Sequence, residues 1–280
     1  MRTRLWLTVL VGTFVALMTA RPSRSEETVE KSANDEQLAK LKELLEKAVD
    51  WYDVLPDAQA KNRLPPHVVM RWRNAVRVET GAALMAVWTD HGRPEAMASI
   101  FQWDNDICHE FGSLSRTNDV VARNKTGVIW SPAKSGVEFH DLSDGPDPAG
   151  SPAARLRQMK AIAERFTARL PARIGGTTPE VLRLLPSPLY RYELKESKGA
   201  GQQLQDGGMF AFVMGTDPEV ILLLEVVRRK DDAVWQYAFA RATAWPAEAS
   251  LGDKVVWSVD SDTQADKPTN PQFQIRRPLP

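Results

Sequence analysis

The sequence is poor in the residues that mark disulfide-rich and metal-dependent proteins. Cysteine occurs once, at Cys108, so no disulfide can form within the chain. None of the four histidines has another at helical or strand chelate spacing, and we expect no metal site. Basic and acidic residues balance at 36 each, which gives no overall field directed at nucleic acid. The 43% apolar and 26% charged composition is typical of a folded chain.

Motifs of common chemistries are also missing. The sequence has no nucleophile elbow of the form G-x-S-x-G, and no S-x-x-K motif followed by K-T-G. The glycines at 199 and 201 are followed by glutamines and not by a lysine, so no phosphate-binding loop is predicted. We therefore expect no cofactor.

The N-terminus has the pattern of a secretory signal peptide. Arg2 and Arg4 precede an uncharged run from 5 to 20, which is shorter than the roughly 20 residues of a membrane-spanning helix. Cleavage is predicted after Ala20 or Ser25, since small residues stand there. Removing residues 1–20 deletes two of the 36 basic residues and leaves a charge of about −2, with no transmembrane segment expected in the mature chain. The predicted location is periplasmic or extracellular.

Export makes the single cysteine informative. A leftover thiol in an exported protein could pair with another chain or act as a nucleophile. Cys108 follows Ile107 and lies three residues before Phe111 in a predicted strand. This apolar setting favours a buried, inert thiol. Stability must then come from the apolar core.

The pattern predicts an α+β fold with mainly antiparallel strands. We expect a signal peptide over 1–25, a disordered linker over 26–34, a single domain over 35–259 and a disordered tail over 260–280. Leucines spaced three and four residues apart predict a helix from 35. The segments 81–100 and 207–224 each read as a hairpin with a Pro-Glu restart, followed by a third strand. These two three-stranded meanders could be a duplication.

A second helix is expected between the meanders. Ser151-Pro152 is a typical start, and the apolar stripe predicts a helix from Pro152 to Leu170. In the later strand, Ala238, Ala240 and further alanines share one face. We expect this amphipathic helix to pack on that row of small side chains.

Two sets of candidate site residues stand out. Acid/base chemistry could use His109, Glu110, Asp90 and His91 if they meet near one end of the sheet, although His109 and Glu110 should point to opposite faces of a strand. Tryptophan is the one excess, with nine residues against four tyrosines. Rings at strand ends can stack on sugars, while core packing is the alternative. The aromatic candidates for ligand binding are Trp88, Trp103, Trp130, Trp235 and Tyr237.

Several segments resemble a known family. They are PEAMAS at 94–99, HEFGSL at 109–114, RLLPSPLYRY at 183–192, GTDPEV at 215–220 and WQYA at 235–238. Together they resemble a family of uncharacterised exported proteins of planctomycete bacteria, over about residues 65–260. The resemblance implies export and a shared fold, and it carries over no catalytic residues.

Three functions remain open at this point. The missing catalytic motifs and the tryptophan excess favour a non-enzymatic module that binds a small molecule, a glycan or an envelope protein. A secreted hydrolase with acid/base groups around His109 and Glu110 is the first alternative, because triads assemble from distant positions. A structural protein of the cell envelope is the second.

Overall fold

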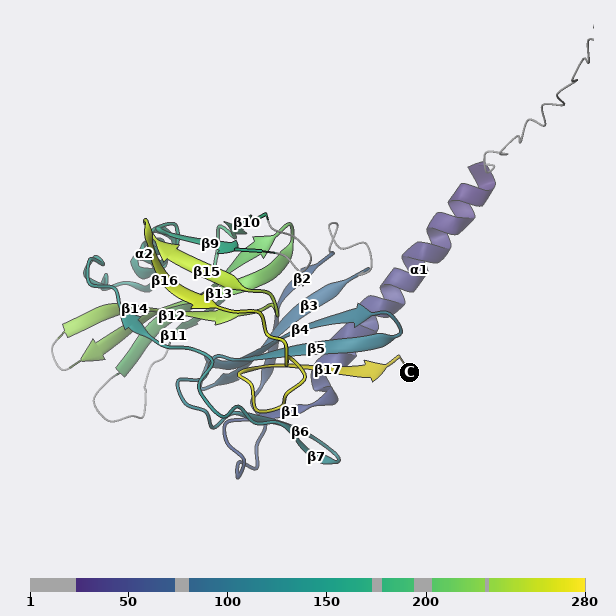
Figure 1. Cartoon of the computed structure of the whole chain (residues 1–280), viewed down its shortest axis with the longest axis horizontal. Coiled ribbons are helices and arrows are strands. Elements are labelled where there is room, and N and C mark those ends of the chain that lie inside the picture. Colours follow the sequence, from purple (N-terminus) through teal and green to yellow (C-terminus); the bar gives the residue numbers. More distant parts are fainter. Residues whose placement is uncertain (1–23, 74–80, 173–177, 194–202, 230–231, 280) are drawn as a thin grey trace, which may run out of the picture. The chain divides into compact units, whose positions relative to one another are not determined.

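The fold is described by a computed structural model of the whole chain (Figure 1). The structure describes residues 24–73, 81–172, 178–193, 203–229 and 232–279. Two compact units are distinguished, residues 1–37 and 38–280, and the sheets lie in the second. Most of the predicted signal peptide lies outside the described residues. No helix in the described ranges has the length and apolar character needed to cross a membrane.

Helix α1 begins earlier than predicted. It spans Arg24–Ala48, so residues 26–34, expected to be a disordered linker, are helical. Three of these nine residues are glutamates, which favour helices even where no apolar stripe is present. The predicted stripe is confirmed further on, where Leu45, Ala48 and Tyr52 are buried. A short 3-10 turn, η1 (Val49–Trp51), ends the helical segment.

Five antiparallel strands form one sheet in the order β17-β5-β4-β3-β2. Their bounds are β2 Pro66–Trp72, β3 Ala83–Asp90, β4 Arg93–Trp103, β5 Asp106–Ser113 and β17 Gln272–Pro278. The prediction of a disordered tail over 260–280 is therefore wrong for β17, which pairs with β5 along its whole length. Phe273 and Ile275 alternate with polar residues and pack on the core, a period-two pattern hidden by the surrounding prolines.

A second sheet has nine strands, and a third has three. The path of the larger sheet is β16-β15-β9-β10-β12-β13-β14-β8, with β11 pairing β12 to one side. Its bounds are β8 His140–Asp141, β9 Phe166–Leu170, β10 Glu180–Leu184, β11 Tyr190–Glu193, β12 Gln203–Met214, β13 Asp217–Arg229, β14 Asp232–Arg241, β15 Ala247–Leu251 and β16 Lys254–Val259. The small sheet is formed by β1 (Asp53–Leu55), β6 (Val121–Asn124) and β7 (Gly127–Trp130). The α+β prediction with antiparallel sheets is confirmed, whereas the description as two three-stranded meanders is not, because the sheets have five, nine and three strands.

Helix α2 is shorter than predicted. It spans Pro152–Ala163, and the Ser151 side chain accepts a hydrogen bond from the Ala154 N–H at 3.3 Å, which confirms the predicted cap. The chain then turns at Glu164, and residues 166–170 form strand β9 instead of further helix. Burial alternates strictly along β9, as expected of a strand, so the apolar residues of this segment fit a period of two as well as a helical period.

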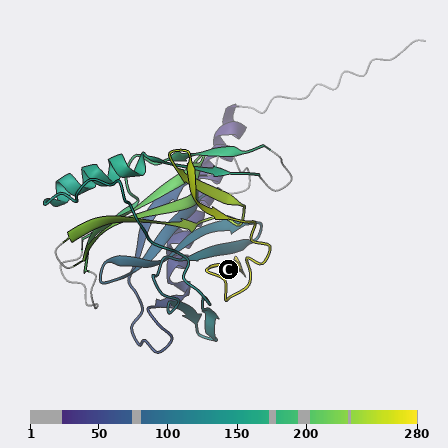
Figure 2. The ribbon, with the colours of Figure 1, turned by 60° about the vertical axis from the view of Figure 1, so that its left-hand side comes forward.

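The two larger sheets pack face to face. The layer between them is made of small and flexible side chains, including Ala211, Ala238, Ala240, Met85 and Met97. The row of alanines thus lies against the other sheet, and the prediction that α2 covers it is wrong. Small side chains let the backbones of the two sheets approach each other closely. Helix α2 instead lies on the opposite face of the nine-stranded sheet, as Figure 2 shows.

Candidate functional site

His109, the centre of the predicted acid/base group, is a core residue. Its ring is fully buried, with Nε2 lying 2.9 Å from the Ala48 carbonyl oxygen. The rings of Tyr52 and Phe111 lie against it, at 4.9 and 5.8 Å between centroids. Burial lowers the pKa of His109 to about 4, so the ring is neutral at pH 7 and donates from Nε2. It has no access to a substrate in solvent.

The other predicted acid/base residues do not join His109. Glu110 faces the other side of β5, where Gln274 Nε2 donates to its Oε1 at 3.1 Å. Asp90 and His91 lie at the β3–β4 turn, 3.7 Å apart. His109 pairs with Ile100, seven residues along β4 from Arg93, so the turn is about 23 Å away at 3.3 Å per residue. The structure does not bring these four side chains together.

The predicted aromatic candidates are mostly core residues too. Trp88, Trp130 and Trp235 are buried, and Tyr237 is nearly so. Trp130 Nε1 donates to the Asn270 carbonyl at 2.8 Å, a link between the small sheet and the C-terminal segment. Trp103 alone of the five is accessible, with 36% of its surface exposed and the Arg276 guanidinium 4.8 Å from its ring centroid. The five rings therefore do not form a shared stacking surface.

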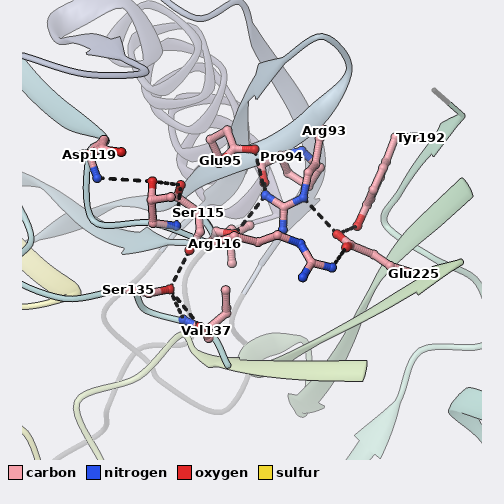
Figure 3. Close-up of polar contacts among 12 residues, drawn as sticks. Arg93, Pro94, Glu95, Ser115, Arg116, Asp119, Ser135, Val137, Tyr192 and Glu225 are labelled. Carbon is pink, nitrogen blue, oxygen red and sulfur yellow. Dashed lines mark hydrogen bonds and ion pairs between the residues drawn. The ribbon is translucent and has the colours of Figure 1, made fainter. Parts of the chain in front are cut away.

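The most conspicuous polar feature is a group of buried charges at one end of the two sheets. We call it the Glu225 cluster and define it by Arg93, Glu95, Arg116, Tyr192 and Glu225 (Figure 3). The Glu225 carboxylate accepts from Arg93 Nε at 3.0 Å, from the Tyr192 hydroxyl at 2.8 Å and from Arg116 Nη2. Arg93 comes from the five-stranded sheet and Glu225 from the nine-stranded sheet, so the cluster joins them.

The charged groups of the Glu225 cluster pair with one another. Burial alone would raise the pKa of the Glu225 carboxyl, but Arg93 and Arg116 hold it below its ordinary value. Burial and the neighbouring Glu225 raise the pKa of the Tyr192 hydroxyl well above its ordinary value. Both carboxylate oxygens already accept hydrogen bonds from ionised or strong donors, which leaves Glu225 unsuited to act as a base. We therefore interpret the cluster as a group that stabilises the fold.

A pocket of about 390 Å³ lies near the Glu225 cluster, on the other side of residues 113–116. Its walls come from β5, β14, β16, β17 and the loops at 134–136 and 260–271, and we call it the β17 pocket. Ser135 lines the pocket and donates to the Ser115 carbonyl at 2.6 Å, while Arg93 donates to the neighbouring Leu114 carbonyl at 3.2 Å. The segment 113–116 thus separates the pocket from the Glu225 cluster.

Gln272 carries an unsatisfied polar atom in this pocket. It is 4% exposed, and its Oε1 has no hydrogen-bond partner among the described residues. Gln272 pairs with Gly112, and both residues line the pocket. Ser113 also lines the pocket, and its buried Oγ has no partner either. Of these two unpartnered atoms, the amide oxygen of Gln272 can only accept a hydrogen bond, whereas the Ser113 hydroxyl can donate or accept.

Arg241 supplies a fixed donor group in the pocket. Its Nε and Nη2 donate to the Thr243 and Trp245 carbonyls, each at 2.9 Å, which orients the guanidinium. Burial lowers the pKa of Arg241, and Asp262 and Asp260 offset this only in part. An arginine remains protonated at pH 7, so the Arg241 guanidinium is a positively charged donor at the pocket.

No family model, curated protein or solved structure matches this chain.

The chemistry of the β17 pocket must accordingly be judged from its own residues. Its described lining contains neither histidine nor cysteine, and the Ser135 hydroxyl donates to backbone carbonyls. Among the described residues, no hydrogen bond joins a lining carboxylate, Asp260 or Asp262, to a lining serine hydroxyl. The lining offers the unpartnered Gln272 Oε1 and Ser113 Oγ, a positioned guanidinium, and the ring of Trp257 as an apolar wall. Such a set suits recognition of a ligand.

Sequence reasoning did not find these residues. Gln272 fell in the tail predicted to be disordered, and Arg241 carries no motif. The signal that could have found Gln272 is the alternation of Phe273 and Ile275 with glutamines, which indicates a strand with one polar face. Among the described residues, no three His, Cys, Asp or Glu side chains are grouped to hold a metal ion.

Proposed function

We propose that the protein is an exported, non-enzymatic module that binds a small hydroxyl-rich molecule of the sugar class in the β17 pocket. The observation that carries the proposal is the buried, unpartnered Oε1 of Gln272 at this pocket. Leaving such an acceptor without a donor costs about 1–3 kcal/mol. A ligand hydroxyl would recover that cost when it binds.

The other groups favour the same ligand class. A hydroxyl can donate to Gln272 and accept from Arg241, which a purely anionic or cationic group cannot do at both places. The charged lining residues are Lys134, Arg241, Asp260 and Asp262, whose formal charges cancel, and this favours a neutral ligand. Trp257 offers a ring face of the kind on which a sugar can stack. A volume near 390 Å³ falls within the range of small-molecule pockets.

Export is part of the proposal. It is supported by the basic and apolar pattern of the first 25 residues and by the resemblance to exported planctomycete proteins. Periplasmic or extracellular location follows from these two features. An envelope glycan or glycoprotein is then the natural source of a sugar ligand.

Binding can be tested by intrinsic tryptophan fluorescence and thermal shift against a panel of sugars, glycans and metabolites. We expect at least one hydroxyl-rich compound to raise the Tm and to change the fluorescence. The variant Gln272→Leu should weaken binding by about tenfold or more, because each 1.4 kcal/mol corresponds to a factor of ten. Its control is Gln274→Leu, two residues along the same face and outside the pocket, which should bind normally.

Two outcomes would overturn the proposal. One is that no compound of the panel gives a saturable response. The other is equal weakening of binding by both variants, which would place the ligand elsewhere. Co-sedimentation of the chain with cell envelopes without any small-molecule response would instead support the structural alternative.

A further inference from the structure

A second pocket lies at the opposite edge of the five-stranded sheet, between the C-terminal half of α1 and strands β2 and β3. Its volume is about 340 Å³, and we call it the helix pocket. All of its lining residues belong to the unit 38–280. It shares no residue with the β17 pocket, so its function can be tested independently.

The inner part of the helix pocket is apolar. Leu45 of α1, Trp72 of β2, and Ala83 and Leu84 of β3 line it, and each is no more than 7% exposed. These residues also belong to the packed core, so the apolar wall is held by the fold. An apolar surface of this kind gains free energy when it leaves water, whatever the shape of the hydrocarbon that covers it.

The rim of the helix pocket is positively charged. Three cations, Lys42, Arg71 and Arg73, and one carboxylate, Glu46, complete the lining. Arg71 Nε lies 2.6 Å from Glu46 Oε1, so these two charges neutralise each other. Within the ranges that the structure describes, Lys42 and Arg73 form no ion pair. The rim therefore carries two uncompensated positive charges beside an apolar interior.

From this juxtaposition we propose that the helix pocket binds an amphipathic anion, a single acyl chain ending in a carboxylate. The chain lies against Leu45, Trp72 and Leu84, and the carboxylate meets Lys42 and Arg73 at the mouth. The occupant is one free chain and not a bilayer, because the apolar surface is recessed behind the rim and has space for a single small ligand. A neutral hydrocarbon would leave Lys42 and Arg73 without a counterion.

The test uses dodecanoate as the probe and the full chain as the protein. Titration calorimetry, together with quenching of the fluorescence of Trp72 and its neighbours, should show saturation at one dodecanoate per chain. Dodecanol should bind more weakly, and acetate should give no saturation. These two probes separate the contribution of the charge from that of the chain.

The charge-reversal variant K42E/R73E should weaken dodecanoate binding by about tenfold or more, because two charges that attract the carboxylate become two that repel it. Both positions are exposed, so the variant should fold, which a thermal melt confirms. The matched control K125E/K254E reverses two exposed lysines outside this pocket and should bind normally.

Three results would overturn the proposal. They are binding that fails to saturate at one per chain, equal loss in the two double variants, and binding of dodecanol as tight as that of dodecanoate. Vesicles of anionic phospholipid provide the last arm. Pelleting with vesicles that depends on Lys42 and Arg73, without binding of free dodecanoate, would reassign the site to a membrane surface.

Discussion

Two polar regions lie on either side of the segment 113–116, and they differ in how completely their hydrogen bonds are made. In the Glu225 cluster both carboxylate oxygens accept from buried or half-buried donors. Its exception is Arg93 Nη2, which has no hydrogen-bond partner in the described chain, although the guanidinium lies 5.6 Å from the Phe139 ring centroid. In the β17 pocket, Gln272 Oε1 is also buried. It accepts no hydrogen bond from the described residues, and it lies at the cavity. A satisfied buried group holds a fold together, whereas an unsatisfied group beside a cavity is available to a ligand.

The comparison predicts its largest effect at Glu225. The variant Glu225→Gln removes the negative charge, which leaves Arg116 without a counterion and the buried Arg93 with Glu95 as its remaining ion-pair partner. Breaking a buried ion pair by neutralising one partner typically destabilises a protein by about 3–5 kcal/mol. We expect a loss of this size in the free energy of unfolding, measured by urea denaturation at pH 7.

The control for this variant is a surface ion pair. Arg169 Nη2 lies 2.6 Å from Glu248 Oε2, and both side chains are partly exposed. Glu248→Gln should cost less than about 1 kcal/mol, since solvent screens such pairs. If the two variants cost the same, the Glu225 cluster does not hold the two sheets together.

The next effect is a pH dependence that comes from His109. Its folded pKa of about 4 lies below the ordinary value of 6.5, so only the unfolded chain takes up a proton between these values. The stability that His109 contributes is complete above pH 6.5 and is lost as the pH falls toward 4. The difference corresponds to about 3 kcal/mol. Glu225 has a lowered pKa, so its own contribution is lost only at more acidic pH.

The variant His109→Leu separates these two windows. It should flatten the dependence of unfolding free energy on pH between 6.5 and 4.5, although it also removes the bond to Ala48. His91→Gln, at the exposed β3–β4 turn, is the matched control and should keep the slope of the parent protein. An unchanged slope in His109→Leu would mean that His109 has the same pKa in the folded and unfolded states.

The hairpins could be predicted from their turn residues, whereas the segment in which two periodicities compete could not. The hairpins at 81–100 and 207–224 are apolar on both faces and are interrupted by glycine and proline turns, and they form β3–β4 and β12–β13. Residues 166–170 fit a helix and a strand equally well, and the strand formed because β10 and β15 pair with it. Such pairing partners are distant in sequence, so no local pattern reveals them.

The candidate site was out of reach for a related reason. Tryptophans and histidines attract attention by residue type, yet burial decides their role, and His109 and Trp88 proved to be core residues. Gln272 and Arg241 have ordinary residue types and become distinctive only through what surrounds them. The β17 pocket depends on a contact between β5 and β17, two strands more than 150 residues apart, and no spacing rule covers that range.

The smallest effect, and the sharpest test of the comparison, is the stability of Gln272→Leu without ligand. If Oε1 is truly unsatisfied, leucine removes a desolvation cost and keeps a similar volume, so the unfolding free energy should stay equal or rise by about 1 kcal/mol. Gln274→Leu should instead lose a little stability, because it breaks the hydrogen bond to Glu110. Urea denaturation of both variants gives the comparison directly. A loss above about 1 kcal/mol in Gln272→Leu would show that its amide is already satisfied, and the difference between the two polar regions would disappear.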